Sequence, residues 1–265
     1  MTAPADEAPG WGRRQLLVVV VAVVLVVVSV GVGVAYAVHG AVASSTTPTA
    51  VAVAVEELPS GQARRDAIAA APMLDVAPQD ARGGTPATSP APRIVVSPAA
   101  SLGPADVPTG FDRTPEGAVG QLAAIATTVL QGVSIERTRA VYEQWSAPGA
   151  PVVDEWALMA AVQAFLASDA GRYVDEPGTS VVTVPAAAQV KGSDGDDWVV
   201  ACVLLDVTAT VVTEARAAYG HCERLQWADD RWVVAAGEAP ETAPSTWPGT
   251  DLAGAAGWRT WTTKE

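Results

Sequence analysis

The chain has 265 residues, 49% of them hydrophobic, and a formal net charge of -13. A surface this acidic repels a phosphate backbone, which argues against direct binding of DNA or RNA. The length allows one ordinary folded domain beside an anchor and a linker.

An uncharged apolar run occupies residues 16–38. A helix needs about 20 apolar residues to cross the hydrocarbon core of a bilayer. Within that core every backbone polar group must find a partner in the segment itself, so a single span has to be helical despite its many valines. We therefore expect a transmembrane helix over residues 16–38, which makes this a single-pass protein of the cell membrane.

The flanks of this run predict its orientation. Arg13 and Arg14 stand directly before it, and the positive-inside rule then keeps residues 1–15 in the cytoplasm as a short stub. Everything that follows is expected outside the membrane. A cleaved signal peptide is the alternative, because Ala35 and Ala37 match a small-x-small cleavage pattern, but the run exceeds the usual ~7–15 residues of such peptides.

Residues 39–108 are rich in alanine, proline, serine, threonine and valine. Recurrent prolines interrupt helices and central strands, so we expect a flexible stalk that spaces the domain from the membrane. Two pieces have a pattern of their own. Residues 60–71 can form a short helix, and residues 93–96 can add as a strand to the sheet edge of a partner.

The folded domain is expected over residues 109–236 and begins with three helices. Thr114 is a suitable N-cap for a helix over residues 115–131, where apolar residues recur at helical spacing. Ser134 and Asp154 are the corresponding caps of the second and third helices.

Alternating patterns replace the helical ones in the second half of this domain. Residues 182–191 predict a strand with a bulge at Pro185, because proline cannot pair within a central ladder. Residues 197–212 give the strongest strand signal, and residues 217–227 and 232–234 complete an antiparallel run. Three helices followed by antiparallel strands predict an α+β fold.

The two cysteines, Cys202 and Cys222, lie on strands that we expect to be adjacent. Counting residues from the bend near Thr213 brings them almost opposite each other, and the space outside the membrane is oxidising. We therefore predict a disulfide. His221 is a poor base for a reactive thiol, because neighbouring side chains on a strand point to opposite faces; a half-buried polar residue is expected instead.

Few residues offer catalytic or metal-binding chemistry. The chain has only two histidines, and the cluster of Asp194, Asp196 and Asp197 lacks the spacing of a calcium loop, so a solvated turn is expected there. Asp206 stands in the strongest strand, where pairing with Arg216 or Arg224 is simpler than a catalytic role. We predict no enzyme activity, no cofactor and no metal.

Residues 237–265 form a tail that contains Trp247, Trp258 and Trp261. Each ring buries a large apolar area, so the ordinary outcome is that they fold back over the sheet or the first helix. The alternative is an exposed aromatic patch for a partner, and these three residues are our candidates for a protein contact.

Four segments follow the N-terminal anchor in the order FDRTPEGAVGQLAAIATTVLQ, DDWVVACVLLDVTAT, GHCERLQWADDRWVVAAG and STWPGTDLAGAAGWR. They resemble a family of uncharacterised actinobacterial membrane proteins, commonly encoded in integrative and conjugative elements. The architecture is also similar to the bitopic channel-assembly components of type IV secretion machines, whose outer domain has a cone-shaped nuclear-transport-factor-two-like fold. No functional residue carries over from this likeness of architecture.

The resemblance implies a scaffold of a conjugative DNA-transfer apparatus, which self-associates or binds other transfer proteins. A different function remains open, namely a domain that binds a lipid, a peptide or a cell-wall fragment in the cavity of the cone. Trp145, Trp156 and Tyr173 are the candidates to line such a cavity.

Overall fold

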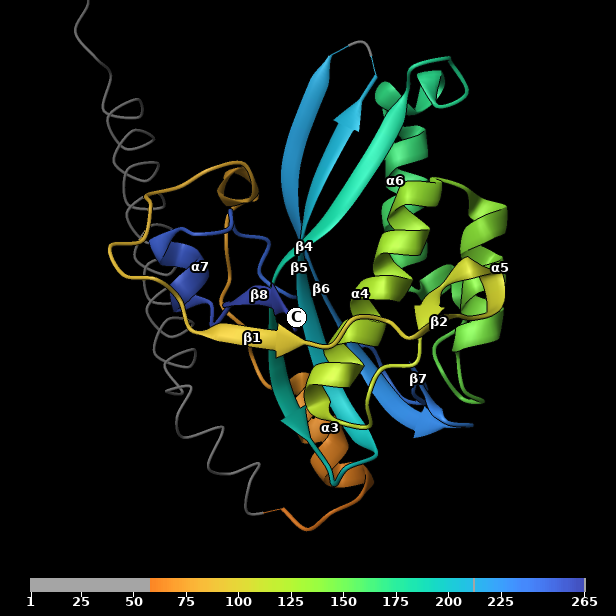
Figure 1. Cartoon of the computed structure of the whole chain (residues 1–265), viewed down its shortest axis with the longest axis vertical. Coiled ribbons are helices and arrows are strands. Elements are labelled where there is room, and N and C mark those ends of the chain that lie inside the picture. The colour runs from red at the N-terminus through yellow and green to blue at the C-terminus, as the bar shows by residue number, and fades with distance from the viewer. Residues whose placement is uncertain (1–57, 212, 265) are drawn as a thin grey trace, which may run out of the picture. The chain divides into compact units, whose positions relative to one another are not determined.

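The computed structural model describes residues 58–211 and 213–264. In this part of the chain a six-stranded sheet of order β1-β8-β4-β5-β6-β7 curls into a half-barrel (Figure 1). The strands are β1 (Arg93–Val96), β4 (Ser180–Ser193), β5 (Trp198–Thr210), β6 (Glu214–Ala228), β7 (Arg231–Val234) and β8 (Arg259–Thr263). The predicted α+β class is confirmed.

Neighbouring strands run antiparallel except β1 and β8, which are parallel. The register of β4 against β5 shifts between Pro185 and Ala187, which confirms the predicted bulge. The same pairing sets Cys202 of β5 directly opposite Cys222 of β6, and the two form the predicted disulfide.

Three helices pack on one side of the sheet, here called the helix face. They are α4 (Pro115–Gly132), α5 (Ile135–Trp145) and α6 (Ala157–Ala167). The Thr114 hydroxyl accepts the N–H of Gly117 at 3.1 Å, and the Ser134 hydroxyl accepts that of Arg137 at 3.3 Å, so two predicted caps are confirmed.

The cap predicted at Asp154 is wrong. Asp154 lies in a short 3-10 turn, η3 (Val153–Glu155), and its carboxylate pairs with Arg139 at 3.1 Å. α6 begins only at Ala157, after Trp156, which supplies no side-chain cap. Trp156 itself is 2% exposed.

Alternate residues of β5 belong to two different cores. Val199, Ala201, Val203 and Leu205 pack against the three helices. The opposite side, here called the outer face, contains Trp198, Val200, Cys202 and Leu204. Two segments cover the outer face, namely α3 (Gln62–Ala70) near the start of the described chain and the stretch 235–258, which includes α7 (Asp251–Ala255).

The part of the predicted stalk that the structure describes is folded. Ile68 of α3 is 4% exposed and Ile94 of β1 is 1% exposed. β1 pairs with the chain's own β8, not with the sheet of a partner. The prolines of this segment stand between these elements, so they do not prevent residues 58–108 from covering apolar surface that would otherwise face water.

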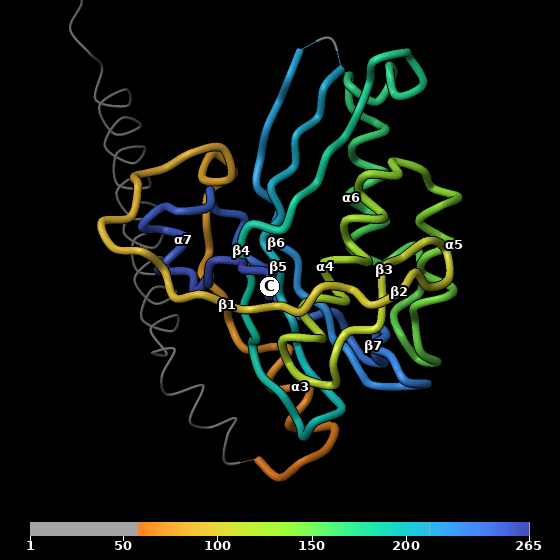
Figure 2. Tube along the Cα trace, in the orientation of Figure 1, coloured from red at the N-terminus to blue at the C-terminus, as the bar shows by residue number. Residues whose placement is uncertain are grey.

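Short elements complete this segment and the connections between the helices and β4. They are η1 (Pro78–Ala81), β2 (Ser101–Leu102), η2 (Pro104–Asp106), β3 (Pro108–Thr109) and η4 (Ala170–Tyr173). β2 and β3 form a separate two-stranded sheet. The Cα trace in Figure 2 shows β1 passing close to β4 before the chain reaches α4.

The predicted cytoplasmic stub at 1–15, transmembrane helix at 16–38 and first part of the stalk lie outside the described residues. Within residues 58–211 and 213–264, every helix is too short or too polar to cross a bilayer.

Two ion pairs attach α3 to the sheet. The buried carboxylate of Asp194 accepts hydrogen bonds from Nε of Arg65 at 2.6 Å and from the backbone N–H of Gly61 at 3.1 Å. On the next residue of the helix, Asp66 pairs with the buried guanidinium of Arg224 at 2.6 Å. Arg65 and Arg224 both stand over the ring of Trp198, at 5.6 and 5.9 Å from its centroid.

The prediction of a solvated turn is therefore wrong for Asp194, whose side chain is buried. Burial alone raises the pKa of this carboxyl group. Hydrogen bonds from Arg65, Gly61 and Ser60 outweigh that effect, and the pKa lies below its ordinary value. Folding thus favours the charged form of Asp194.

We expect the substitution Asp194→Asn to lower the free energy of unfolding by about 1–2 kcal/mol at neutral pH, because it removes the negative charge that accepts the hydrogen bonds from Arg65, Gly61 and Ser60. The carboxylate stabilises the fold above the ordinary aspartate pKa of about 4, and this contribution disappears as the pH falls through the lower pKa of the folded state. Urea unfolding at pH 7 and pH 3 measures both effects. An equal deficit at the two pH values would contradict this account.

Candidate functional site

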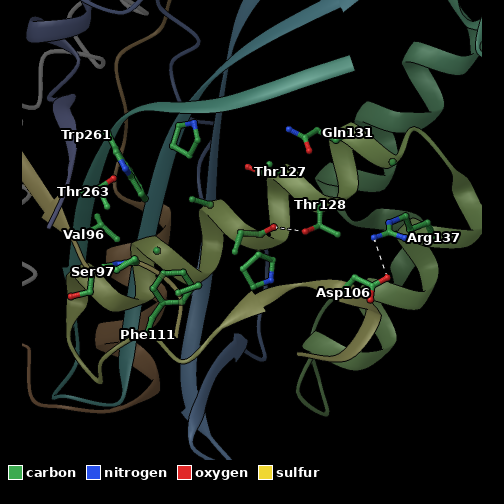
Figure 3. Close-up of a pocket in the computed structure, with 18 residues that line it drawn as sticks. Val96, Ser97, Asp106, Phe111, Thr127, Thr128, Gln131, Arg137, Trp261 and Thr263 are labelled. Carbon is green, nitrogen blue, oxygen red and sulfur yellow. Dashed lines mark hydrogen bonds and ion pairs between the residues drawn. The ribbon is translucent and has the colours of Figure 1, made fainter. Parts of the chain in front are cut away.

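A groove of about 740 Å³ lies alongside α4, at the place where β8 leaves β4 (Figure 3). One wall is formed by small and polar residues of α4, among them Ala123, Thr127, Thr128 and Gln131. The other wall combines the residues after β1 with Trp261 of β8 and Pro185 of β4. We call this feature the edge groove.

The edge groove exists because β8 accompanies β4 only briefly. The two strands pair at Ala187 with Thr260 and at Ala188 with Arg259, and β8 then continues along β1. Within the described residues, the first half of β4 therefore pairs with β5 on one side and with no strand on the other. The edge groove is the space opened in this way, and α4 and Trp261 border it.

The helix wall of the edge groove is shaped by small residues. Gly120 lies under the ring of Phe111, and a Cβ atom there would stand 2.6 Å from a ring carbon. Glycine is therefore required for the aromatic ring to lie flat against α4. Ala123 and Ala124, one turn further on, leave the groove open.

Polar groups in the edge groove are few and mostly uncharged. The Thr128 hydroxyl donates to the carbonyl of Ala124 at 2.8 Å, and the Gln131 amide donates to the carbonyl of Thr183 at 3.0 Å. The buried hydroxyl oxygen of Thr127 has no hydrogen-bond partner. Arg137 and Asp106 pair at 3.6 Å across one end. An apolar channel with a few directed polar groups suits binding better than acid–base catalysis.

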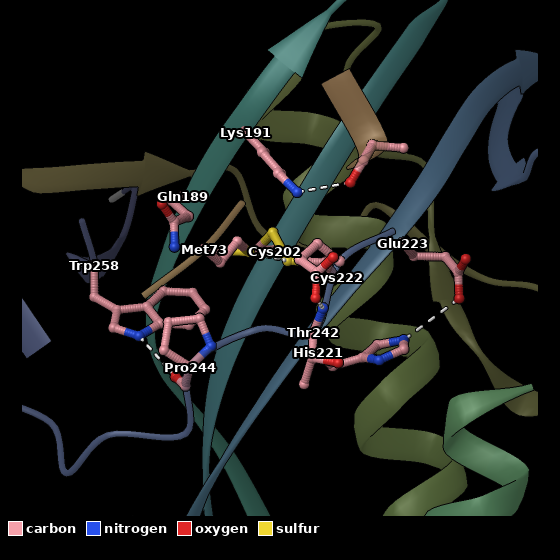
Figure 4. Close-up of a disulfide and its surroundings, with 12 residues drawn as sticks. Met73, Gln189, Lys191, Cys202, His221, Cys222, Glu223, Thr242, Pro244 and Trp258 are labelled. Carbon is pink, nitrogen blue, oxygen red and sulfur yellow. Dashed lines mark hydrogen bonds and ion pairs between the residues drawn. A yellow bond between two sulfur atoms is a disulfide. The ribbon is translucent and has the colours of Figure 1, made fainter. Parts of the chain in front are cut away.

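A second cavity of about 240 Å³ lies between β6, the start of α6 and the stretch that follows Ala239. Tyr219, His221 and Glu223 alternate along β6 and share the helix face. The carboxylate of Glu223 accepts the indole N–H of Trp156 at 2.8 Å and lies 3.5 Å from Nε2 of His221 (Figure 4). Tyr219 stacks on the imidazole, with ring centroids 6.1 Å apart.

Burial dominates the electrostatics of this cluster. His221 and Glu223 are each 4% exposed, so His221 is more deeply buried than the predicted half-buried residue. Desolvation, reinforced by the charge of Glu223, raises the pKa of Tyr219 to about 12. Cys222 belongs to the outer-face core and is held in the disulfide, so His221 has no thiol to activate. Glu223 was not among the predicted site residues, although the sequence places it at i, i+2 from His221.

The structure separates the three residues that were candidates for a ligand cavity. Trp145 is fully buried in the helix-face core, and its indole N–H donates to the carbonyl of Pro104 at 3.0 Å. Trp156 lines the second cavity. Tyr173 is 45% exposed in η4 and lines neither cavity. A single site made of these residues is therefore not formed.

The three tryptophans of the tail do not form one exposed patch. Trp258 is 2% exposed in the outer-face core and donates its indole N–H to the carbonyl of Pro244 at 3.0 Å. Trp247 is half-buried with the Arg216 guanidinium 5.0 Å above its ring. Trp261 is half-buried in the edge groove. Folding back onto the sheet is the outcome for all three, and only Trp261 borders a candidate site.

Asp206 pairs with Arg216, as predicted. The guanidinium donates from Nε to one carboxylate oxygen at 2.7 Å and from one terminal nitrogen to the other. This carboxylate raises the pKa of the Arg216 guanidinium, mainly through the hydrogen bonds it accepts. The other predicted partner, Arg224, binds Asp66 instead. Asp206 is not among the residues that line the edge groove or the second cavity.

The remaining acidic residues of the predicted turn do not gather around a metal. Asp197 pairs with Arg113. Across residues 58–211 and 213–264, no group of three or more histidine, cysteine, aspartate or glutamate side chains is arranged to hold a metal ion.

Comparison with known proteins gives no assignment. No protein-family model matches the chain, and no curated protein or solved structure is similar to it. The resemblance to proteins of conjugative elements therefore stays a prediction from the sequence.

We expect Glu223→Ala to lower the free energy of unfolding by about 1–3 kcal/mol, because it leaves the buried indole N–H of Trp156 without an acceptor. Glu223→Gln is the matched control, since an amide oxygen keeps that acceptor and the volume of the side chain. Urea unfolding followed by tryptophan fluorescence measures the difference. Equal losses in the two variants would show that the hydrogen bond to Trp156 contributes nothing.

Proposed function

We propose that the chain is a membrane-anchored assembly component of a conjugative DNA-transfer apparatus, and that its domain binds other proteins on the outer side of the membrane. The anchor is supported by the apolar run at 16–38 behind Arg13 and Arg14. The link to DNA transfer is supported by the four segments that resemble proteins of conjugative elements.

The fold is compatible with this proposal. We assign the curled sheet with α4, α5 and α6 on its helix face to the cone-shaped nuclear-transport-factor-two-like class, which the outer domains of bitopic secretion components share. This assignment is an analogy of architecture, and a fold alone does not determine a function.

The observation that carries the proposal is the edge groove beside an unpaired half of β4. Exposed strand edges recruit other chains, and proteins usually cover or charge them. Here the edge adjoins a channel lined by Trp261 and by uncharged polar side chains. Such a surface fits a protein contact, whereas Glu223 and His221 in the second cavity are each only 4% exposed.

A donor strain that lacks this chain tests the proposal. We expect conjugative transfer to fall to background and to recover with the full-length protein. Crosslinking in intact donor cells should join the outer domain to a transfer ATPase or a channel subunit. Unchanged transfer in the deletion strain would contradict the proposal.

A matched pair of variants connects the function to the edge groove. Thr128→Arg places a bulky charge in the groove and is expected to lower transfer about tenfold or more, as loss of a central contact does at protein interfaces. Thr88→Arg makes the same change at an exposed loop position and should leave transfer unchanged. Protein level and thermal stability of both variants serve as the control for folding.

The volume of the edge groove also falls within the range of small-ligand pockets, about 300–1,000 Å³, and this favours ligand binding as a second candidate function. Native mass spectrometry of the purified chain tests it. A bound lipid, peptide or cell-wall fragment would support this candidate, and a spectrum of the protein alone would count against it.

A further inference from the structure

The open edge of β4 has a defined hydrogen-bonding pattern. Gln131 donates its side-chain amide to the carbonyl of Thr183, so that carbonyl points away from β5. In an antiparallel ladder the N–H and C=O of one residue point to the same side, and the side alternates along the strand. The backbone groups of Val181, Thr183 and Pro185 thus face the open edge.

Pro185 is consistent with this alternation. It has no N–H to donate, and proline is tolerated in a sheet where its nitrogen faces outward from an edge. The open row consists of the N–H and C=O of Val181, the N–H of Thr183 and the C=O of Pro185. The Thr183 carbonyl already accepts a hydrogen bond from the Gln131 amide, which occupies the position of a donor on a neighbouring strand.

Residues 180–184 of this edge lack the charges that commonly discourage pairing. Residues 180–184 read SVVTV and carry no charge. The side chains of Val182 and Val184 are 50% and 54% exposed. The first half of β4, the second half of β5 and the first half of β6 pair with one another, so β6 forms the opposite edge of this part of the sheet. That edge carries Glu214 and Arg216, and charged side chains of this kind discourage pairing with another chain. The difference between the two edges singles out β4.

The edge groove runs beside this row of backbone groups. Pro185 and Gln131 border both, and the unpartnered hydroxyl of Thr127 and the ring of Trp261 line the channel. An extended chain paired with β4 would direct alternate side chains toward α4 and the channel. Charged groups occur only at the Arg137 end, which favours an uncharged segment.

We propose that the outer domain binds its partner by strand addition: an extended, uncharged and proline-free segment of the partner, about five residues long, pairs with β4 at residues 181–185 and places alternate side chains in the edge groove. Main-chain hydrogen bonds supply the affinity, and the groove supplies the selectivity. This inference rests on the proposed function, because it specifies how the domain contacts another protein.

The test uses the full-length chain in detergent micelles and a phage library of random short peptides as the probe. Selected peptides are synthesised with a fluorescent label, and their binding is measured by anisotropy. We expect the selected segments to lack proline and charge. N-methylation of alternate backbone nitrogens on the pairing side should abolish binding, whereas methylation of the other nitrogens should not.

Val181→Pro removes one N–H from the open edge without touching the ladder to β5 and is expected to weaken peptide binding about tenfold or more. Thr128→Arg leaves β4 unchanged and should weaken peptide binding by a similar factor. It tests the proposal independently if Val181→Pro perturbs folding. Thr88→Pro, in an exposed loop, is the matched control and should bind like the unaltered chain.

The proposal is overturned if the library yields no binder, or if Val181→Pro and Thr128→Arg both bind the selected peptides as well as the unaltered chain does. Self-association that Val181→Pro abolishes would assign the edge to a second copy and would also overturn it. These outcomes are separate from the function itself. Peptide binding at β4 with unchanged transfer in the deletion strain refutes only the role in conjugation, whereas loss of transfer without peptide binding refutes only strand addition.

Discussion

Burial of β5 on both faces is the constraint on which the rest of the structure depends. From Trp198 to Leu205 every side chain is buried, which requires a covering layer on each side of the sheet. Each large apolar side chain removed from water contributes about 1.5–3 kcal/mol, so neither layer is dispensable. The three helices supply one layer. The other is assembled from two segments far apart in the sequence, α3 and residues 235–258.

The disulfide belongs to the second of these layers. Cys202 and Cys222 join β5 to β6 on the outer face, in the same apolar cluster as Trp198 and Trp258. With a sequence separation of 20 residues, loop closure accounts for about 3 kcal/mol of stabilisation in the chain-entropy description. The bond therefore secures the two central strands, while the first half of β4 stays open at its edge.

Local signals in the sequence were sufficient for the elements with strong periodicity. Thr114 and Ser134 mark the starts of helices because a cap bonds to backbone groups only a few residues away. The residue pattern of 197–212 predicted β5 because it contains mostly apolar and β-branched side chains on both faces of a strand. The prediction of a flexible stalk was wrong for residues 58–108, because their prolines indicate only local stiffness. The short helix and the strand expected within this segment are present as α3 and β1. Whether Ile68 and Ile94 are buried depends on an apolar face of β5 and on β8, far along the chain. Asp194 was misread for the same reason, since its partners lie on α3.

The candidate site was less accessible to prediction than the fold. Trp261 was singled out as an aromatic residue, but the edge groove arises where β8 turns from β4 to β1, and no local pattern contains that divergence. The pairing of Asp206 with Arg216 was predictable, because a charge in a long strand needs a nearby partner. The contact between Glu223 and Trp156 joins a strand to the start of a helix and follows only from the tertiary packing.

The central claim is that the chain from residue 58 onward is an integral part of the folded domain. Hydrogen exchange of the full-length protein, followed by mass spectrometry of its peptides, tests this most directly. If α3 covers the outer face as described, its amides should exchange slowly, with protection approaching that of β5. Complete exchange of α3 within seconds, while β5 stays protected, would show that this segment is a flexible linker and would contradict the account.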